Sequence, residues 1–103
     1  MMDIGKIRRA FSEYKFRYTK HAAEQRIARR VSGEEIEESI LGGEIIEQYP
    51  TDKYGPSCLI CGQAKSGRVL HIQIALLPMI SVVTVYEPNP KEWIDHKIRR
   101  RQR

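Results

Sequence analysis

A chain of 103 residues with 41% hydrophobic and 30% charged residues is long enough to bury a core without metal or disulfide support and too short for two domains. Its longest apolar stretch, residues 74–80, contains Pro78 and is far too short for a bilayer, so we expect no membrane span. No continuous apolar segment with a small-residue cleavage site follows the first residues, and we expect a cytoplasmic protein.

The net charge of +5 is unevenly distributed along the sequence. Residues 1–30 hold nine Lys or Arg against three acids, residues 34–52 hold seven acids and no base, and residues 97–103 form a basic tail with five cations. Such segregation creates a local field that a mixed surface would cancel. One region of the surface is therefore expected to attract an anion.

The two cysteines, Cys58 and Cys61, stand three apart in a segment that is typical of a strand. Residues three apart in a strand point to opposite faces, so the two sulfurs would diverge rather than bridge. A zinc site would also need two more ligands, and there is no second cysteine pair. We therefore expect structural thiols, no metal site and no cofactor.

The first part of the chain is predicted to be helical. Residues 3–14 show apolar side chains at spacings of three and four, and Lys15 to Tyr18 reads as a brief extended link. Thr19 is a suitable N-cap for a helix to about Arg30, whose expected buried stripe is Ala23, Ile27 and Val31. Ser32 to Glu35 matches a capping box, and that helix should end at residues 42–43 with a left-handed glycine.

After Gly43 the apolar period changes to two, which indicates strands. We expect four of them, at residues 44–49, 57–64, 68–77 and 80–86. The short connections favour antiparallel neighbours. Residues 88–90 should end the sheet, and residues 93–100 should form a helical turn or two. The predicted fold is thus one α+β domain over residues 1–103, with N-terminal helices on one face of a four-stranded antiparallel sheet and a short C-terminal helix.

The third strand alternates most clearly and places polar groups on the face away from the helices. Its core side should hold Leu70, Ile72, Ile74 and Leu76. His71 and Gln73 then lie on the open face, and Thr84 and Tyr86 share one face of the next strand. If those two faces coincide, a polar cluster forms on a rigid sheet; the alternative is an ordinary solvated sheet face.

A second cluster is basic and lies on the helix that follows Thr19. Arg26 and Arg30 are four apart and point to one side, where guanidinium groups could hold a phosphate. The alternative is a solvated flank paired with Glu24 or Glu34. His21 lies elsewhere around the helix and would join the arginines only if a groove wrapped the first turn.

Five ordered pieces of the sequence carry a family resemblance. They are Tyr18 to Arg26, Arg30 to Ser32 with Glu35 and Ile36, Gly43 to Pro50, His71 to Ala75, and Thr84 to Pro88 with Trp93. Over about residues 15–95 the chain resembles a small bacterial domain of unknown function that is grouped with RelE-like toxins. The resemblance implies the fold shared by barnase, EndoU and RelE, and a partner antitoxin, commonly of the YgiT type with a zinc finger and a helix-turn-helix.

The same resemblance implies a metal-independent endoribonuclease that acts on RNA, with or without the ribosome. Such cleavage needs a base, an acid and a cation for the phosphate. The implied positions are catalytic His21, His71, Thr84 and Tyr86, with phosphate contacts from Arg26 and Arg30. The tail residues Lys97, Arg99, Arg100 and Arg101 would add salt-dependent affinity for RNA.

Two other classes of function use the same charges. A catalytically inactive RelE-like module would dock an acidic protein partner or the ribosome and would need no histidine chemistry. A basic antitoxin or DNA-binding regulator is disfavoured, since no helix-turn-helix is predicted from the extended second half.

Overall fold

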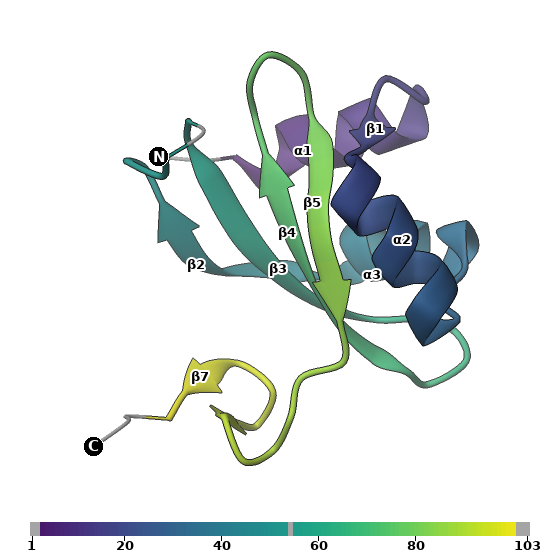
Figure 1. The fold of residues 1–103 in the computed structure, drawn as a ribbon, viewed down its shortest axis with the longest axis vertical. Coiled ribbons are helices and arrows are strands. Elements are labelled where there is room, and N and C mark those ends of the chain that lie inside the picture. Colours follow the sequence, from purple (N-terminus) through teal and green to yellow (C-terminus); the bar gives the residue numbers. More distant parts are fainter. Residues whose placement is uncertain (1–2, 54, 101–103) are drawn as a thin grey trace.

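The computed structural model describes residues 3–53 and 55–100 as an α+β domain with three helices and a five-stranded mixed sheet. Figure 1 shows the helices gathered along one side of the sheet. The helices are α1 (Ile4–Ser12), α2 (Lys20–Arg29) and α3 (Gly33–Gly42). The sheet strands are β1 (Arg17–Tyr18), β2 (Glu44–Tyr49), β3 (Ser57–Gln63), β4 (Val69–Ala75) and β5 (Ser81–Tyr86). The described ranges contain no helix that is long and apolar enough to cross a membrane.

The four expected strands pair as an antiparallel meander, in the order β5-β4-β3-β2. The sheet nevertheless contains a strand that a four-stranded antiparallel arrangement lacks. The short link β1 adds to β5 in parallel, with Arg17 N donating to the Ile80 carbonyl and Thr19 N to that of Val82. Parallel pairing is possible because the whole of the intervening chain serves as the connection between the two strands.

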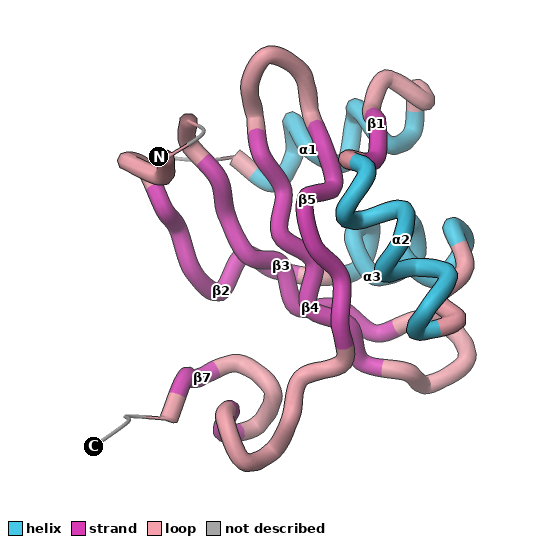
Figure 2. Tube along the Cα trace, in the orientation of Figure 1, coloured by secondary structure: helices cyan, strands magenta, loops and turns pink. Residues whose placement is uncertain are grey.

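The expected C-terminal helix is wrong, because residues 93–99 form a separate hairpin, β6 (Trp93–Ile94) with β7 (Ile98–Arg99). Two residues of its turn, Asp95 and His96, both have positive φ, at 52° and 65°. That conformation matches the twist of a hairpin and cannot continue a helix. Figure 2 shows this hairpin beyond the end of β5 and well away from α2.

The core lies between the three helices and one face of the sheet. Ile7 and Phe11 of α1 and Ile36 and Ile40 of α3 are fully buried there. The sheet contributes fully buried Ile60, Leu70, Ile72, Ile74, Val82 and Val85. Burying this many large apolar side chains, each contributing about 1.5–3 kcal/mol, holds the helices on the sheet.

The orientation of α2 differs from the expected one. Val31 is buried, but Ile27 is 81% exposed and the fully buried alanine is Ala22. The helix is turned so that polar side chains, rather than an apolar stripe, face β5. Ile27 is left on the outer surface as a consequence.

Those polar side chains satisfy the edge of β5 that β1 leaves uncovered. Thr19 Oγ1 donates to the Val83 carbonyl at 3.4 Å, Gln25 Oε1 accepts from Val85 N at 3.0 Å, and Arg29 Nη1 donates to the Val85 carbonyl at 2.9 Å. An unpaired strand edge would otherwise present a row of free backbone groups. Side chains of α2 and of its N-cap Thr19 thus take the place of a neighbouring strand.

Candidate functional site

Cross-strand register gathers polar residues on the face of the sheet opposite the helices. One row across the four antiparallel strands holds Glu44, Cys61, His71 and Tyr86. The next row holds Glu47, Leu59, Gln73 and Thr84. Residues in register share a face. The open face therefore carries His71, Gln73, Thr84 and Tyr86 together.

His71 is not exposed on this face, because the β6–β7 hairpin covers it. Its exposed fraction is 0%, and its ring packs edge-on against Trp93 with centroids 4.4 Å apart. Its Nε2 is hydrogen-bonded to the His96 carbonyl, and its Nδ1 lies 3.2 Å from the Tyr86 hydroxyl. Burial lowers the pKa of His71, while the His96 carbonyl and Glu47 partly offset that effect.

These contacts fix the tautomer of the imidazole. A carbonyl oxygen only accepts, so the Nε2 atom must carry the proton. In the neutral ring that burial favours, Nδ1 is then a lone-pair acceptor. Tyr86 is consequently the donor in its hydrogen bond with His71.

Arg99 holds the hairpin onto β2. Its guanidinium lies 4.5 Å from the Trp93 ring centroid and donates to both oxygens of Glu47, at 3.0 and 3.2 Å. Burial alone would raise the pKa of Glu47, but these bonds and a hydrogen bond from Tyr49 lower it. Lys97 adds an exposed ion pair with Glu44 at 2.9 Å, and that hydrogen bond raises the pKa of Lys97. Lys97 and Arg99, from the predicted basic tail, are thus tied to acidic β2.

Two hollows meet at Tyr86 and Arg99. The first, here called the arginine hollow, has a volume of about 590 Å³ and is lined by Arg29, Arg68, Tyr86, Glu87, Glu92, Trp93 and Arg99. The second, here called the tyrosine hollow, has a volume of about 380 Å³ and is lined by Tyr49, Asp52, Leu59, Gln73, Thr84, Tyr86 and Arg99. Because both share Tyr86 and Arg99, a ligand larger than either hollow could occupy the two at once.

The other predicted residues lie elsewhere. His21 is exposed on α2, and Arg26 donates to the Val31 carbonyl at 3.2 Å and stacks over the Tyr18 ring at 4.8 Å. Arg30 ends α2 in a left-handed conformation. Arg100 donates to the Pro90 carbonyl at 2.9 Å, and Arg101 is outside the described residues. The structure brings His71, Thr84, Tyr86 and Arg99 together and leaves His21, Arg26 and Arg30 apart from them.

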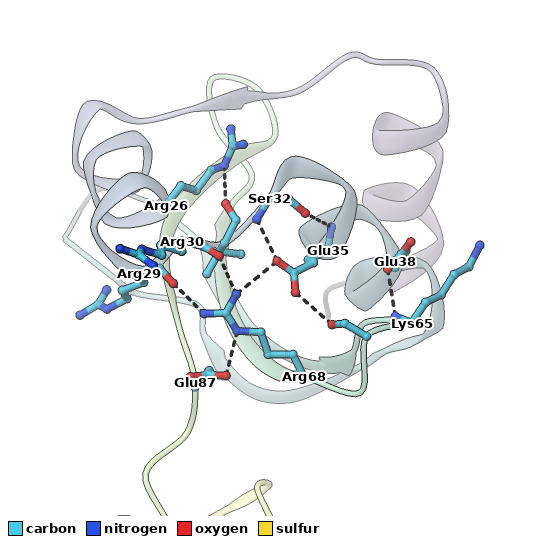
Figure 3. Close-up of polar contacts among 11 residues, drawn as sticks. Arg26, Arg29, Arg30, Ser32, Glu35, Glu38, Lys65, Arg68 and Glu87 are labelled. Carbon is cyan, nitrogen blue, oxygen red and sulfur yellow. Dashed lines mark hydrogen bonds and ion pairs between the residues drawn. The ribbon is translucent and has the colours of Figure 1, made fainter.

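Sequence reasoning missed Arg29 and Arg68, which line the arginine hollow. Figure 3 shows the Arg68 guanidinium at the centre of a polar cluster. It donates to the carbonyls of Arg29 and Arg30 at the end of α2, at 2.6 and 2.7 Å, and pairs with Glu35 and Glu87, at 3.2 and 2.8 Å. Arg68 therefore joins the end of α2, the start of α3 and the segment after β5, and its charge is largely compensated within the fold.

The two cysteines are free and buried, one on each face of β3. Burial raises the pKa of the Cys58 thiol to about 11 and also raises that of Cys61. Thiols of raised pKa are poor nucleophiles and poor metal ligands. Within residues 3–53 and 55–100, no group of three His, Cys, Asp or Glu side chains is arranged to hold a metal ion.

Comparison with known proteins places most of this fold in one family. The model of a domain of unknown function, DUF4258, matches residues 18–87, which run from β1 to just beyond β5. The match contains His71 and Tyr86 and ends before the hairpin that covers His71. No curated protein and no solved structure gives a significant match. The grouping with RelE-like toxins stays a prediction, whereas the chain itself belongs to the DUF4258 family of domains of unknown function.

Proposed function

We propose that this protein is the toxin of a toxin–antitoxin pair and cleaves RNA without a metal, at Tyr86 on the open face of the sheet. The observation that carries the proposal is the hydrogen bond from the Tyr86 hydroxyl to His71 Nδ1, 3.2 Å long, beside a hollow lined by Arg29 and Arg99. A proton acceptor for the 2′-hydroxyl and a cation for the phosphate are two of the three kinds of group that such cleavage needs, and solvent water serves as the acid in this proposal.

In this proposal Tyr86 contacts the substrate and His71 acts through it. The 2′-hydroxyl gives its proton to the Tyr86 oxygen, while the phenol's own proton passes to His71 Nδ1. The 2′-oxygen bonds to phosphorus, the bond from phosphorus to O5′ breaks, and O5′ keeps the electron pair and takes a proton from solvent. The products are a 2′,3′-cyclic phosphate and a 5′-hydroxyl, and His71 later returns its proton to solvent through Tyr86.

The surrounding charges act on both ends of this transfer. Glu47 favours the protonated form of His71, whereas burial and the nearby charges of His96 and Arg99 oppose that form. Arg29 and Arg99 flank Tyr86 in the arginine hollow and can stabilise the charge that grows on the phosphate. Of the arginines expected to hold phosphate, Arg26 and Arg30 lie away from this hollow, so Arg29 takes their place in the proposal.

The test is cleavage of end-labelled RNA by the purified protein in the presence of a metal chelator. Tyr86→Phe is expected to slow cleavage about 10²- to 10⁴-fold. The matched control is Tyr14→Phe, since the Tyr14 side chain is 78% exposed in the turn after α1. Equal cleavage by wild type and Tyr86→Phe, or dependence on an added metal, would contradict the proposal.

A binding-only role is the second candidate, and a different surface favours it. Lys6, Arg9 and Lys20 are exposed on α1 and α2, and no acidic side chain within the described ranges forms an ion pair with them. This basic surface could dock an acidic protein partner or the ribosome. Charge reversal at Lys6 and Arg9 would then abolish association while Tyr86→Phe would not.

The partner implied by the resemblance, a YgiT-type zinc-finger antitoxin, belongs to the first candidate. Co-expression with such a partner should restore growth to cells arrested by the wild-type protein. Cells expressing Tyr86→Phe should grow with or without the partner.

A further inference from the structure

The tyrosine hollow presents mainly hydrogen-bond acceptors to a ligand. Its polar lining consists of Tyr49, Asp52, Gln73, Thr84, Tyr86 and Arg99. The direction of each hydrogen bond follows from the atom at its other end.

The Thr84 hydroxyl donates its hydrogen bond to a side chain of α2. Gln25 Oε1 accepts from the backbone N–H of Val85 at 3.0 Å, and a backbone N–H can only donate, so this amide atom is the oxygen. The Thr84 hydroxyl, also 3.0 Å from that oxygen, must therefore donate to it. Only lone pairs of Thr84 are left for a ligand.

The two tyrosines have their protons committed in the same way. The Tyr49 hydroxyl donates to Glu47, and the Tyr86 hydroxyl donates to His71. Burial and the bond to Glu47 raise the pKa of Tyr49 to about 12, so the phenol stays protonated. The Tyr86 oxygen can accept a further hydrogen bond, whereas the Tyr49 oxygen already interacts with the Arg99 guanidinium.

The remaining side chains complete the pattern. Gln73 Nε2 donates to Asp52 at 3.4 Å and to Ser57 at 3.3 Å, which leaves the Gln73 carbonyl oxygen as the free end of the amide. The Asp52 carboxylate accepts only. The guanidinium of Arg99 remains a donor in the lining, because its bidentate pair with Glu47 uses only part of its N–H groups.

We propose that the tyrosine hollow is a base-binding subsite selective for a nucleobase with two adjacent N–H donors, which among the four RNA bases is guanine. The inference rests on the proposed function in taking RNA as the ligand. Gln73 and Thr84 are direct cross-strand partners, so their acceptor oxygens can meet neighbouring donors. Guanine offers N1–H and the 2-amino group side by side, whereas the other three bases lack such an adjacent pair on that edge.

The rest of the lining suits a flat, partly apolar ring. Leu59 is 3% exposed and gives the hollow an apolar side, and Tyr49 and Tyr86 offer aromatic surface for stacking. The acceptors and the Asp52 carboxylate disfavour a phosphate group there, whereas in the neighbouring arginine hollow the arginines Arg29, Arg68 and Arg99 outnumber the acids Glu87 and Glu92. Base and phosphate would then lie on opposite sides of Tyr86.

The test uses short 2′-O-methyl oligonucleotides, which cannot be cleaved by the proposed reaction, with a single central guanine or inosine. Inosine lacks only the 2-amino group, so wild-type protein is expected to bind the guanine oligonucleotide about fivefold more tightly or better. Gln73→Met should bring the ratio of the affinities for the guanine and the inosine oligonucleotides close to one. Gln63→Met is the matched control, since Gln63 is exposed and lines neither hollow. Thr84→Val gives a second variant, which removes one acceptor with little change of shape.

The possible results separate the two proposals. A guanine preference without cleavage of ordinary RNA would support the subsite and contradict the ribonuclease. Cleavage with a guanine-to-inosine ratio of one would overturn the subsite alone. Failure of every oligonucleotide to bind would overturn the subsite, as would binding of an arginine-rich peptide in its place, which would assign the hollow to a protein partner.

Discussion

The Nδ1 atom of His71 accepts a hydrogen bond from the Tyr86 hydroxyl at 3.2 Å, because the Nε2–H of the same ring is committed to the His96 carbonyl. His71→Ala would leave both partners without their hydrogen bonds and open a cavity below Trp93. We expect a loss of about 2–4 kcal/mol in the free energy of unfolding, measured by urea denaturation. His21→Ala, at an exposed position on α2, should change it by less than about 0.5 kcal/mol. Equal effects of the two substitutions would show that His71 is not buried as described.

The same histidine should make stability depend on pH. Its pKa is lowered by burial in the folded protein from the ordinary value of 6.5, so below that pH the unfolded chain binds a proton that the folded chain does not. The stabilisation is therefore fully present above pH 6.5 and is lost as pH falls toward the folded pKa, by at most about 1.4 kcal/mol per pH unit. Urea denaturation at about pH 7.5, 6.5 and 5.5 should show that the free energy of unfolding of the wild type falls as the pH falls. In His71→Gln the dependence on pH should be weaker. Parallel slopes would exclude His71 as its source.

Gly62 allows α3 to lie directly on β3. A Cβ atom there would overlap the Ser39 carbonyl oxygen, which belongs to the helix backbone and cannot rotate away. Gly62→Ala is expected to cost about 3 kcal/mol of stability. Gly42→Ala is the matched control, because no atom beyond its chain neighbours and its own helix backbone lies within 4 Å of the position that its methyl group would take, and a helical glycine-to-alanine change gains about 0.5–1 kcal/mol. Thermal unfolding of the two variants should shift in opposite directions.

Arg68 binds three parts of the fold at once. Arg68→Ala removes two hydrogen bonds to the last carbonyls of α2 and the pairs with Glu35 and Glu87, and we expect a loss of about 2 kcal/mol. Arg68→Lys should recover less than half of it, since a single ammonium cannot span the two carbonyls and both acids. Lys65→Ala, at an exposed position in the same loop, controls for loss of charge. Full recovery of the lost stability in Arg68→Lys would show that only the positive charge of Arg68 matters.

Local signals in the sequence predicted the helix ends well. The Thr19 N-cap and the Ser32 capping box are both present, because each depends on atoms within three residues. α3 also ends at residues 42–43 as predicted, but the expected left-handed glycine is wrong. Gly43 is extended, with φ at −92°, and a side chain there would overlap the carbonyl oxygens of Ser39 and Cys61. Close packing requires that glycine, and no local pattern reveals it.

The candidate site was predicted in part, and the limit was again distance along the chain. Period-two alternation placed His71 and Gln73 on the open face, and the register added Thr84 and Tyr86 to it. Alternation could not show that Trp93 would cover His71, since the covering residue lies 22 positions later and its segment resembles a helix. Nor could spacing on α2 distinguish Arg29 from Arg26 and Arg30, because that choice depends on how the helix is rotated against β5.

The way α2 satisfies β5 also determines how copies of this protein could associate. With Thr19, Gln25 and Arg29 bonded to the backbone of β5, and β1 only two residues long, one border of the sheet is closed to a further strand. The opposite border is β2, the last strand in the order. A sheet that can grow at one border only can join a second copy through a two-fold axis and then has no border left for a third. Strand addition at β2 would thus stop at a dimer, and the architecture resists growth into fibres even at high protein concentration.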